Sequence, residues 1–350
     1  MSNRMRYGTV AGVAAIVVVV LGIVYFIMGS RSDSPENAIK MIVKSISEHD
    51  QVKFNKYVDL DTLLNTSYDG FVEGMMNSDD SMSEEVKDHV VNFTQMLKAP
   101  MTLSLKTAIE NYVATGSFAD KEQASKSKTH QDENVLIVAE TLDRMGLNKL
   151  EFRKVEKVII NKDNKNQAMV TINVYQKEVA KEFTFEFMLT KQKSGEWRVV
   201  SIRNFRDFVE MVNQNRREQL NKYLEDTEEI INSHNKTIQE AEQKYSNIIS
   251  NGNLSKDSTR GELQNLMANV IKKDWEARKQ ELFNINVPKG AEALQNLRIK
   301  ICDLSIESAE LYAKWMSDKK AATVKAADSK RKQVKALAEE EKVLTLRISK

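Results

Sequence analysis

The chain contains one cysteine and three prolines among its 350 residues, and its net charge is only +2. A single cysteine cannot form an intramolecular disulfide, and an exported protein without disulfides fits a bacterial envelope better than a eukaryotic secreted domain. Basic and acidic residues are interspersed, which excludes the basic stripe of a nucleic-acid-binding protein. Cys302 lies in a helical apolar pattern beside Ile301 and Leu304, which predicts a buried, unreactive thiol.

The sequence also lacks the short motifs that accompany catalysis or metal binding. It has no glycine-rich phosphate loop and no His-Glu-x-x-His. The pattern Ser-x-x-Lys begins at Ser125, Ser233, Ser317 and Ser329. Chance accounts for these matches, because the companion motifs of serine acyl-enzymes are missing.

Histidines and acidic residues give no metal site either. The histidines are scattered and form no pair one helical turn apart: His49, His89, His130 and His234. An acidic cluster lacks the alternating oxygen spacing of a calcium loop and indicates a solvated helix start: Asp79, Asp80, Glu84 and Glu85. We therefore predict no catalytic, cofactor-binding or metal-binding residues, and we expect a protein that is not an enzyme.

Residues 9–28 form a long apolar run, and no charged residue stands between Arg6 and Arg31. At about 1.5 Å per residue, a helix over this run spans a hydrocarbon core of about 30 Å. A cleaved secretory signal is the alternative, but its apolar region would be shorter. Arginines precede the run, which places the N-terminus in the cytoplasm. We expect residues 1–30 to be a cytoplasmic tip and a single-pass anchor in the lipid bilayer of the cell membrane, with the body outside.

Residues 34–212 are expected to form an α+β domain. Apolar residues at helical spacing predict five helices: Pro35–Glu48, Asp59–Gly74, Glu84–Lys98, Met101–Ala114 and Val135–Met145. Pro100 is expected to open the fourth helix, and a capping box from Ser81 to Glu84 the third. The polar segment Thr115–Glu133 reads as a flexible loop.

Four strands are predicted after these helices. They are Phe152–Ile160, Ala168–Val174, Phe183–Leu189 and Trp197–Ile202. In the third strand, Phe183, Phe185 and Phe187 alternate with polar residues, which predicts a half-buried strand with one aromatic face. Helices followed by a four-stranded meander indicate an antiparallel sheet with helices packed on one face.

Residues 213–350 are expected to be helical to the end. Two seams with 4,3 spacing run through Leu220, Leu224, Thr227, Ile231, His234, Ile238, Ala241, Tyr245 and Ile248, and through Leu294, Leu297, Ile301, Leu304, Ser308, Leu311 and Trp315. Short connections favour an antiparallel α-helical bundle; an intermolecular coiled coil is the alternative. The first seam predicts a partly buried, hydrogen-bonded His234. We also expect a helix stop at Asn251–Asn253 and a capping box at Thr259–Glu262.

The tail from Asp318 carries ten Lys or Arg against five Asp or Glu. A solvated face of a last helix, roughly Ala321–Ile348, explains this composition. Contact with anionic lipid headgroups or wall polymer is the alternative.

Two short motifs carry a resemblance to a known family. Asp50, Phe54 and the run Tyr57–Asp61 follow the first predicted helix, and the run Gly195–Val200 covers the last strand. Over residues 34–212 the chain resembles bacterial envelope proteins with an NTF2-like domain. The resemblance implies a cone of helices packed on a curved antiparallel sheet, with Trp197 and the third strand lining or backing its interior. The predicted helices between about 75 and 145 depart from the usual order of that family.

The NTF2-like family includes enzymes, ligand binders and interaction modules, so the resemblance implies no particular activity. We expect a membrane-tethered, non-catalytic binding or scaffolding protein with a protein partner in the envelope. A small-ligand binder or enzyme that uses the cone's cavity is one alternative, with Glu186, Asp143, Tyr175 and Arg198 as candidate polar groups. Self-association through the heptad seams is another.

Overall fold

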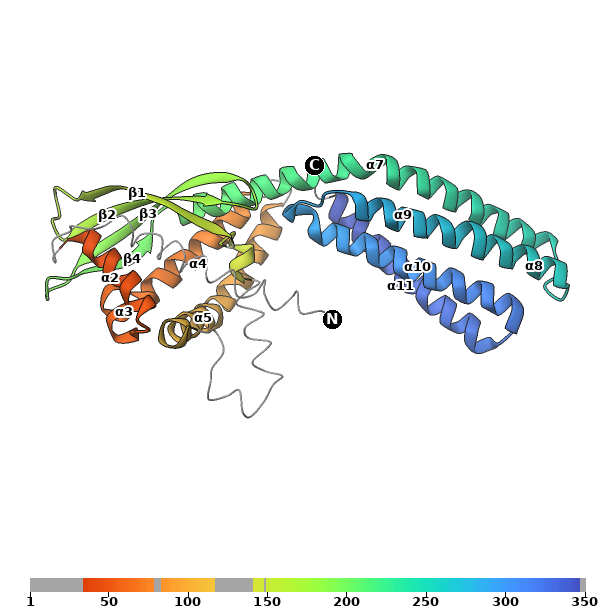
Figure 1. The fold of residues 1–350 in the computed structure, drawn as a ribbon, viewed down its shortest axis with the longest axis horizontal. Helices are drawn as coiled ribbons and strands as arrows, with labels where there is room; N and C mark the ends of the chain where they lie inside the picture. Colours follow the sequence, from red (N-terminus) through yellow and green to blue (C-terminus); the bar gives the residue numbers. More distant parts are fainter. Residues whose placement is uncertain (1–33, 79–82, 117–140, 148, 347–350) are drawn as a thin grey trace. The chain divides into compact units, whose positions relative to one another are not determined.

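A computed structural model describes residues 34–78, 83–116, 141–147 and 149–346 (Figure 1). These residues form a mixed α+β structure with one four-stranded antiparallel sheet and a set of C-terminal helices. It divides into two compact parts: unit 1, up to Gln214, and unit 2, from Asn215. The predicted anchor over residues 9–28 lies outside the described residues. None of the helices in the described ranges is long and apolar enough to cross a membrane.

The sheet of unit 1 is a meander in which each strand is antiparallel to the next. Its order is β1 (Leu150–Ile160), β2 (Gln167–Gln176), β3 (Lys181–Lys191) and β4 (Trp197–Ile202). The four predicted strands are therefore confirmed, and their ends differ by no more than about two residues, the usual uncertainty of a boundary.

Both edges of this sheet are protected. β1 has two register shifts against β2, the first between Phe152 and Lys154 and the second between Val155 and Lys157. Such bulges twist an edge strand and discourage pairing with a strand of another chain. At the other edge Val58 forms a parallel bridge with Val199 of β4.

The helices of unit 1 lie on one side of the sheet (Figure 1). They are α2 (Pro35–Ser47), α3 (Gln51–Tyr57), α4 (Leu60–Asn77) and α5 (Glu84–Thr115), followed after the sheet by the first turns of α7 (Phe205–Asn251). Side-chain oxygens of Ser34, Asp50 and Asp59 accept backbone N–H groups and begin α2, α3 and α4. The short helix α3 was not predicted from the sequence.

The prediction that Pro100 opens a new helix is wrong, because α5 runs without a break from Glu84 to Thr115. A proline inside a helix costs about 3 kcal/mol, since it removes one N–H donor and crowds the preceding turn. Burial of Leu105 and Ala108 in the core of unit 1 offsets this cost. α5 begins with Ser83 as its N-cap.

The predicted loop and the short helix that follows it fall mostly outside the described residues. Within them, residues 141–144 are helical and residues 145–146 form a turn.

The aromatic face of β3 points into the core, as predicted. The Phe185 ring lies 4.8 Å from the Phe208 ring at the start of α7, and the Phe183 ring lies 5.3 Å from it. Trp197 is buried at the start of β4. The core of unit 1 is one continuous apolar cluster between the sheet and its helices.

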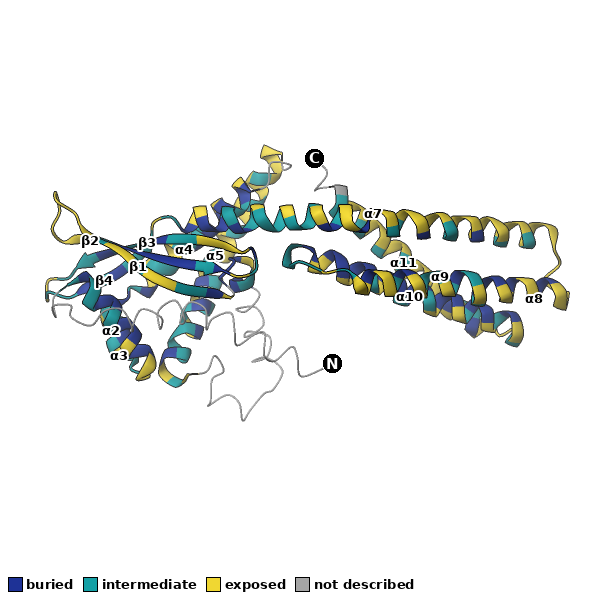
Figure 2. Cartoon of the chain, turned by 45° about the horizontal axis from the view of Figure 1, so that its top comes forward, coloured by how far each residue is buried: buried dark blue, intermediate teal, exposed yellow. Residues whose placement is uncertain are grey.

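Unit 2 is a helical bundle, as predicted. It contains the rest of α7, α8 (Asp257–Leu266), the π-helical segment η2 (Met267–Ile271), α9 (Lys272–Asn284), the short η3 (Lys289–Ala291), α10 (Glu292–Asp318) and α11 (Ala321–Leu346). The seam residues of α7 are buried or half-buried, while the rest of its surface in this unit is largely exposed (Figure 2). Ile238 and Tyr245 of the seam pack against an apolar cluster that includes Ala309 and Tyr312 of α10.

The ends of the unit 2 helices were predicted less well. α7 ends at Asn251, as expected. α8 already begins at Asp257, so Thr259 lies inside this helix and the predicted capping box at Thr259–Glu262 is wrong.

Candidate functional site

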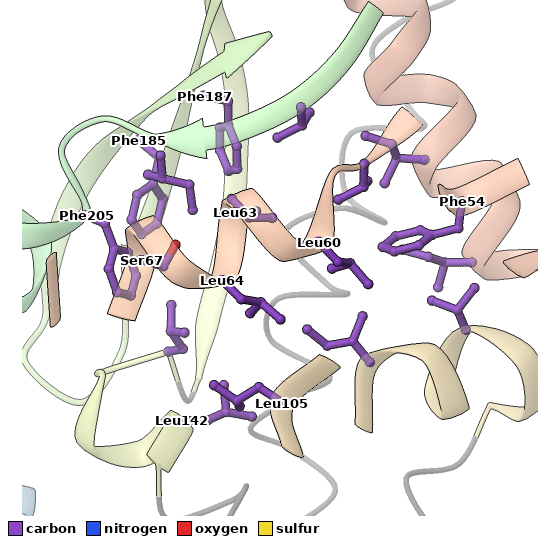
Figure 3. A pocket seen from close by; sticks show the side chains of 18 of the residues that line it. Phe54, Leu60, Leu63, Leu64, Ser67, Leu105, Leu142, Phe185, Phe187 and Phe205 are labelled. Carbon is purple, nitrogen blue, oxygen red and sulfur yellow. The ribbon is translucent and has the colours of Figure 1, made fainter. Parts of the chain in front are cut away.

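Unit 1 contains an apolar cavity between its helices and its sheet, with a volume of ≈ 150 Å³ (Figure 3). Residues from α2, α3, α4, α5, the segment 141–147, all four strands and the start of α7 line it. The lining comprises Ile39, Ile42, Ile46, Phe54, Val58, Leu60, Leu63, Leu64, Ser67, Leu105, Ala108, Ile109, Tyr112, Val113, Leu142, Met145, Leu147, Leu150, Ile172, Phe185, Phe187, Val199, Ile202 and Phe205.

Regular spacing in the sequence places these side chains on the cavity wall. Leu60, Leu63, Leu64 and Ser67 follow one another at the i, i+3, i+4, i+7 spacing of a single helix face, and Figure 3 shows all four on α4. α5 repeats this spacing from Leu105 to Tyr112. On β3, Phe185 and Phe187 stand two residues apart and so share one face of the sheet.

The lining carries almost no polar chemistry. Among the described residues that line the cavity, the hydroxyls of Ser67 and Tyr112 are the only side-chain oxygens, and none of these residues is an Asp, Glu, His, Lys or Arg. The imidazole of His49 lies nearby, but its Nδ1 is 3.1 Å from the carbonyl oxygen of Val113 and it is not part of the wall. The described part of the wall therefore offers mainly apolar contacts to a bound group.

The uncovered part of the wall is concentrated on α4 and α5. The lining residues that remain half-buried are Leu63, Leu64, Ser67, Ile109, Tyr112, Phe187 and Ile202. On the opposite wall, Ile42 and Ile172 are buried. Two ion pairs join α4 and α5 beside the cavity: Lys98 with Asp69, and Lys106 with Asp61, each with an N–O distance of 2.7 Å.

The four polar groups considered for a catalytic cavity lie elsewhere. Glu186 is on the opposite face of β3, where its Oε2 is 3.2 Å from Arg203 Nε. Arg198 donates to the carbonyl oxygen of Val58 at 3.1 Å. Tyr175 lies under the guanidinium of Arg153, at 4.8 Å. Asp143 is half-buried and is not among the lining residues.

Unit 2 concentrates its polar chemistry inside its core. We call this set, Tyr223, Thr227, Gln295, Arg298 and Glu341, the polar layer. Arg298 is 5% exposed; its Nε lies 2.7 Å from Glu341 Oε1, and its Nη1 donates to Thr227 Oγ1 at 2.7 Å. The Tyr223 hydroxyl donates to Gln295 Oε1, and burial raises the pKa of this phenol. These bonds connect α7, α10 and α11 at one level of the bundle.

Two further residues of unit 2 behave as the sequence predicted. His234 is buried, and its Nδ1 lies 2.9 Å from Asp274 Oδ1. Cys302 is 0% exposed, and burial raises the pKa of its thiol to about 11, so little reactive thiolate forms at neutral pH. Across the described residues, no three His, Cys, Asp or Glu side chains gather to hold a metal ion. Asp79 and Asp80 of the predicted acidic cluster lie outside those residues.

The cavity had no local signal in the sequence, because its wall is assembled from many short segments. No protein-family profile matches this chain, and no curated protein or solved structure matches it. The chemistry of the cavity therefore stands on its geometry alone.

Proposed function

We propose that this chain is a non-catalytic, membrane-tethered binding protein whose unit 1 takes an apolar ligand into its cavity. The observation that carries the proposal is the wall of the cavity, which combines open volume with an almost wholly apolar lining among the residues that the structure describes. A pocket with this lining binds by removing apolar surface from water, at roughly 0.8 kcal/mol for each buried CH₂ group.

The volume limits the part of a ligand that enters. An apolar cavity of about 150 Å³ stays dry and accepts a molecule the size of benzene. A small aromatic ring or a short stretch of an alkyl chain fits this space. A longer ligand would leave its remaining part, including any charged group, outside the wall of Leu63, Leu64 and Ile109.

A probe whose fluorescence rises in apolar surroundings, N-phenyl-1-naphthylamine, tests this proposal on the full chain in lipid nanodiscs. We expect saturable binding that Ala108→Phe abolishes, because the new ring fills the cavity. Ala114→Phe adds the same ring to an exposed position of α5 and should leave binding unchanged. Hydrogen exchange would establish that both variants fold. Binding that does not saturate beyond the signal of empty nanodiscs, or equal binding by the two variants, would refute the proposal.

Tethering and the NTF2-like relationship belong to the same proposal. A four-stranded antiparallel sheet covered by helices supports an NTF2-like unit 1, and the apolar run over residues 9–28 supports the anchor. We expect the full chain to stay in the membrane pellet after alkaline extraction and to be cleaved by protease added outside the cell. Release of the chain by alkali would show that residues 9–28 do not anchor it in the membrane.

An exposed apolar face on α5 favours a second function, the binding of a protein partner. Phe93, Met96 and Leu103 are 60%, 78% and 65% exposed, and with Pro100 they follow a 3,4,3 spacing. Apolar patches of this kind mark interaction sites, and this spacing matches the seam of a partner helix. Glu85 lies on the same side of α5, about two turns before Phe93. The occupant we propose is an amphipathic helix of another envelope protein with Lys or Arg at its matching end.

Photo-cross-linking from position 96 in cells tests this second function. The expected product is a peptide with an apolar stripe and basic residues at one end, and Met96→Glu should abolish its formation when the photoreactive group is moved to position 93. A cross-linker at Lys53, on the surface of α3, is the control and should give no such product. Cross-links to lipid alone, or to a second copy of this chain, would contradict the proposed occupant.

A further inference from the structure

The connection between α10 and α11 is a tight turn built from residues that favour a helix. α10 ends at Asp318 and α11 begins at Ala321, so only Lys319 and Lys320 lie between them. Lys319 has a φ of 56° and a ψ of 19°, the left-handed conformation that favours glycine or asparagine. Lysine and alanine are good helix formers, and the segment Ser317–Ala322 has no glycine or proline. The sequence of the turn therefore favours a continuous helix over the observed bend.

One residue holds the turn in place. Asp318 Oδ1 accepts the backbone N–H of Lys320 at 2.9 Å, and its Oδ2 accepts the hydroxyl of Thr323 at 2.8 Å. These bonds offset the strain at Lys319, because they satisfy donors at the start of α11.

The contacts that α11 makes with α10 could equally be made by α11 of a second copy of the chain. α11 lies against α10 (Figure 1), and its polar contacts there are specific: Glu341 with Arg298 at 2.7 Å and Lys330 with Glu307 at 2.6 Å. The hydroxyl of Ser308 on α10 donates to the carbonyl oxygen of Ala327 at 3.2 Å. None of these contacts involves the turn. They would form equally well with α11 of another copy, so exchange conserves their energy and relieves the turn.

From these observations we infer that α11 exchanges between two copies of this chain, forming a dimer in which α10 and α11 are one continuous helix. Residues 292–346 would then form a helix of about 80 Å, with α11 of each copy packed on α10 of the other. This inference goes beyond the proposed ligand-binding function. In this dimer the copies associate by exchanging α11 and not through the heptad seams. The chain's own helices already cover those seams.

Two substitutions at the turn should move the monomer–dimer equilibrium in opposite directions. Lys319→Gly relaxes the bend and weakens the continuous helix. Because two turns form each time a dimer dissociates, we expect the dimer dissociation constant of the full chain in detergent to rise about tenfold or more, measured by light scattering. Asp318→Ala removes the bonds that hold the bend and should lower this constant. Lys325→Gly is the control: it makes the same substitution inside α11, which is helical in both the monomer and the dimer. It should leave the dissociation constant unchanged.

A disulfide reports the exchange directly. In a Cys302→Ala background, Ser308→Cys and Ala327→Cys place thiols on facing positions of α10 and α11. After oxidation, the exchanged dimer gives a covalent dimer on a denaturing gel, whereas a hairpin gives a monomer with an internal disulfide. Covalent dimers that disappear with Lys319→Gly would establish the exchange. Internal disulfides alone, or a full chain that stays monomeric at every concentration, would overturn it.

Discussion

The two units of this chain solve the problem of a core in different ways. Unit 1 has one continuous apolar core and leaves a cavity of ≈ 150 Å³ within it. Unit 2 has two apolar clusters, one around Ala241 and Tyr312 and the other around Ala291 and Leu294, and it also buries the polar layer. A loosely filled apolar core leaves room for a ligand, whereas buried hydrogen bonds specify the register of neighbouring helices. This contrast fits the function proposed above, in which unit 1 binds the ligand and the polar layer fixes how the helices of unit 2 pack.

The largest expected effect comes from breaking the polar layer. Glu341→Ala leaves the buried guanidinium of Arg298 without its carboxylate, and we expect the free energy of opening α10 to fall by about 3–5 kcal/mol. Hydrogen exchange with mass spectrometry measures this value in unit 2 separately from β2 in unit 1. The double variant Arg298→Met, Glu341→Leu should recover most of the loss.

Lys330→Ala is the control for this prediction. It breaks an ion pair with Glu307 in which both partners are partly exposed, and should cost less than about 1 kcal/mol. If Glu341→Ala and Lys330→Ala had equal effects, the buried polar layer would stabilise unit 2 no more than a partly exposed ion pair does.

The next largest effect distinguishes the tightly packed core of unit 1 from its cavity. A Cβ at Gly74 would lie 2.7 Å from the Cβ of Val209, so Gly74→Ala should destabilise unit 1 by about 1–3 kcal/mol. Ala108→Leu adds a larger group, but the new atoms extend into the cavity. This substitution should leave the stability of unit 1 unchanged or raise it by up to about 1 kcal/mol.

The hydrogen-exchange protection of β2 measures the effect of both substitutions on the stability of unit 1. Gly261→Ala in unit 2 has no atom within 4 Å of the new Cβ, and serves as a helix-propensity control that stabilises by about 0.5–1 kcal/mol. A loss of stability in Ala108→Leu as large as that in Gly74→Ala would show that the cavity is not open space.

The smallest effect concerns charge, which unit 1 keeps outside its core. A hydrogen bond from Lys56 lowers the pKa of Glu196 to about 2, from an ordinary value near 4.5. A carboxyl group with a lowered pKa stabilises the fold above its ordinary value, and this contribution is lost as the pH falls from about 4.5 through about 2. NMR titration should give a Glu196 midpoint near 2 that Lys56→Ala raises toward 4.5. An unchanged midpoint would assign the shift to another group.

Local periodicity was enough to predict the strands and most helices. The alternation of Phe183, Phe185 and Phe187 predicted both the strand and the face that enters the core, and the 4,3 spacing placed His234 in the bundle seam. Pro100 was misread because a propensity of one residue was weighed without the packing of Leu105 and Ala108 that overrides it.

The cavity and the polar layer were beyond reach for a different reason. Phe54, Leu105 and Leu142 meet only in the folded chain, and no spacing links them. Arg298 and Glu341 read as ordinary charged residues on helices, and only the tertiary fold shows that the first is buried and that the second is its partner. Features made by long-range contacts leave no periodic trace in a single sequence.

Xenon binding to crystals of the protein tests the central comparison most directly. Xenon enters dry apolar cavities, and its anomalous scattering locates it. We expect a xenon peak in unit 1 among Ile42, Leu105 and Phe185, and none in the polar layer around Arg298 of unit 2. A unit 1 without xenon, or a peak of equal height beside Arg298, would contradict it.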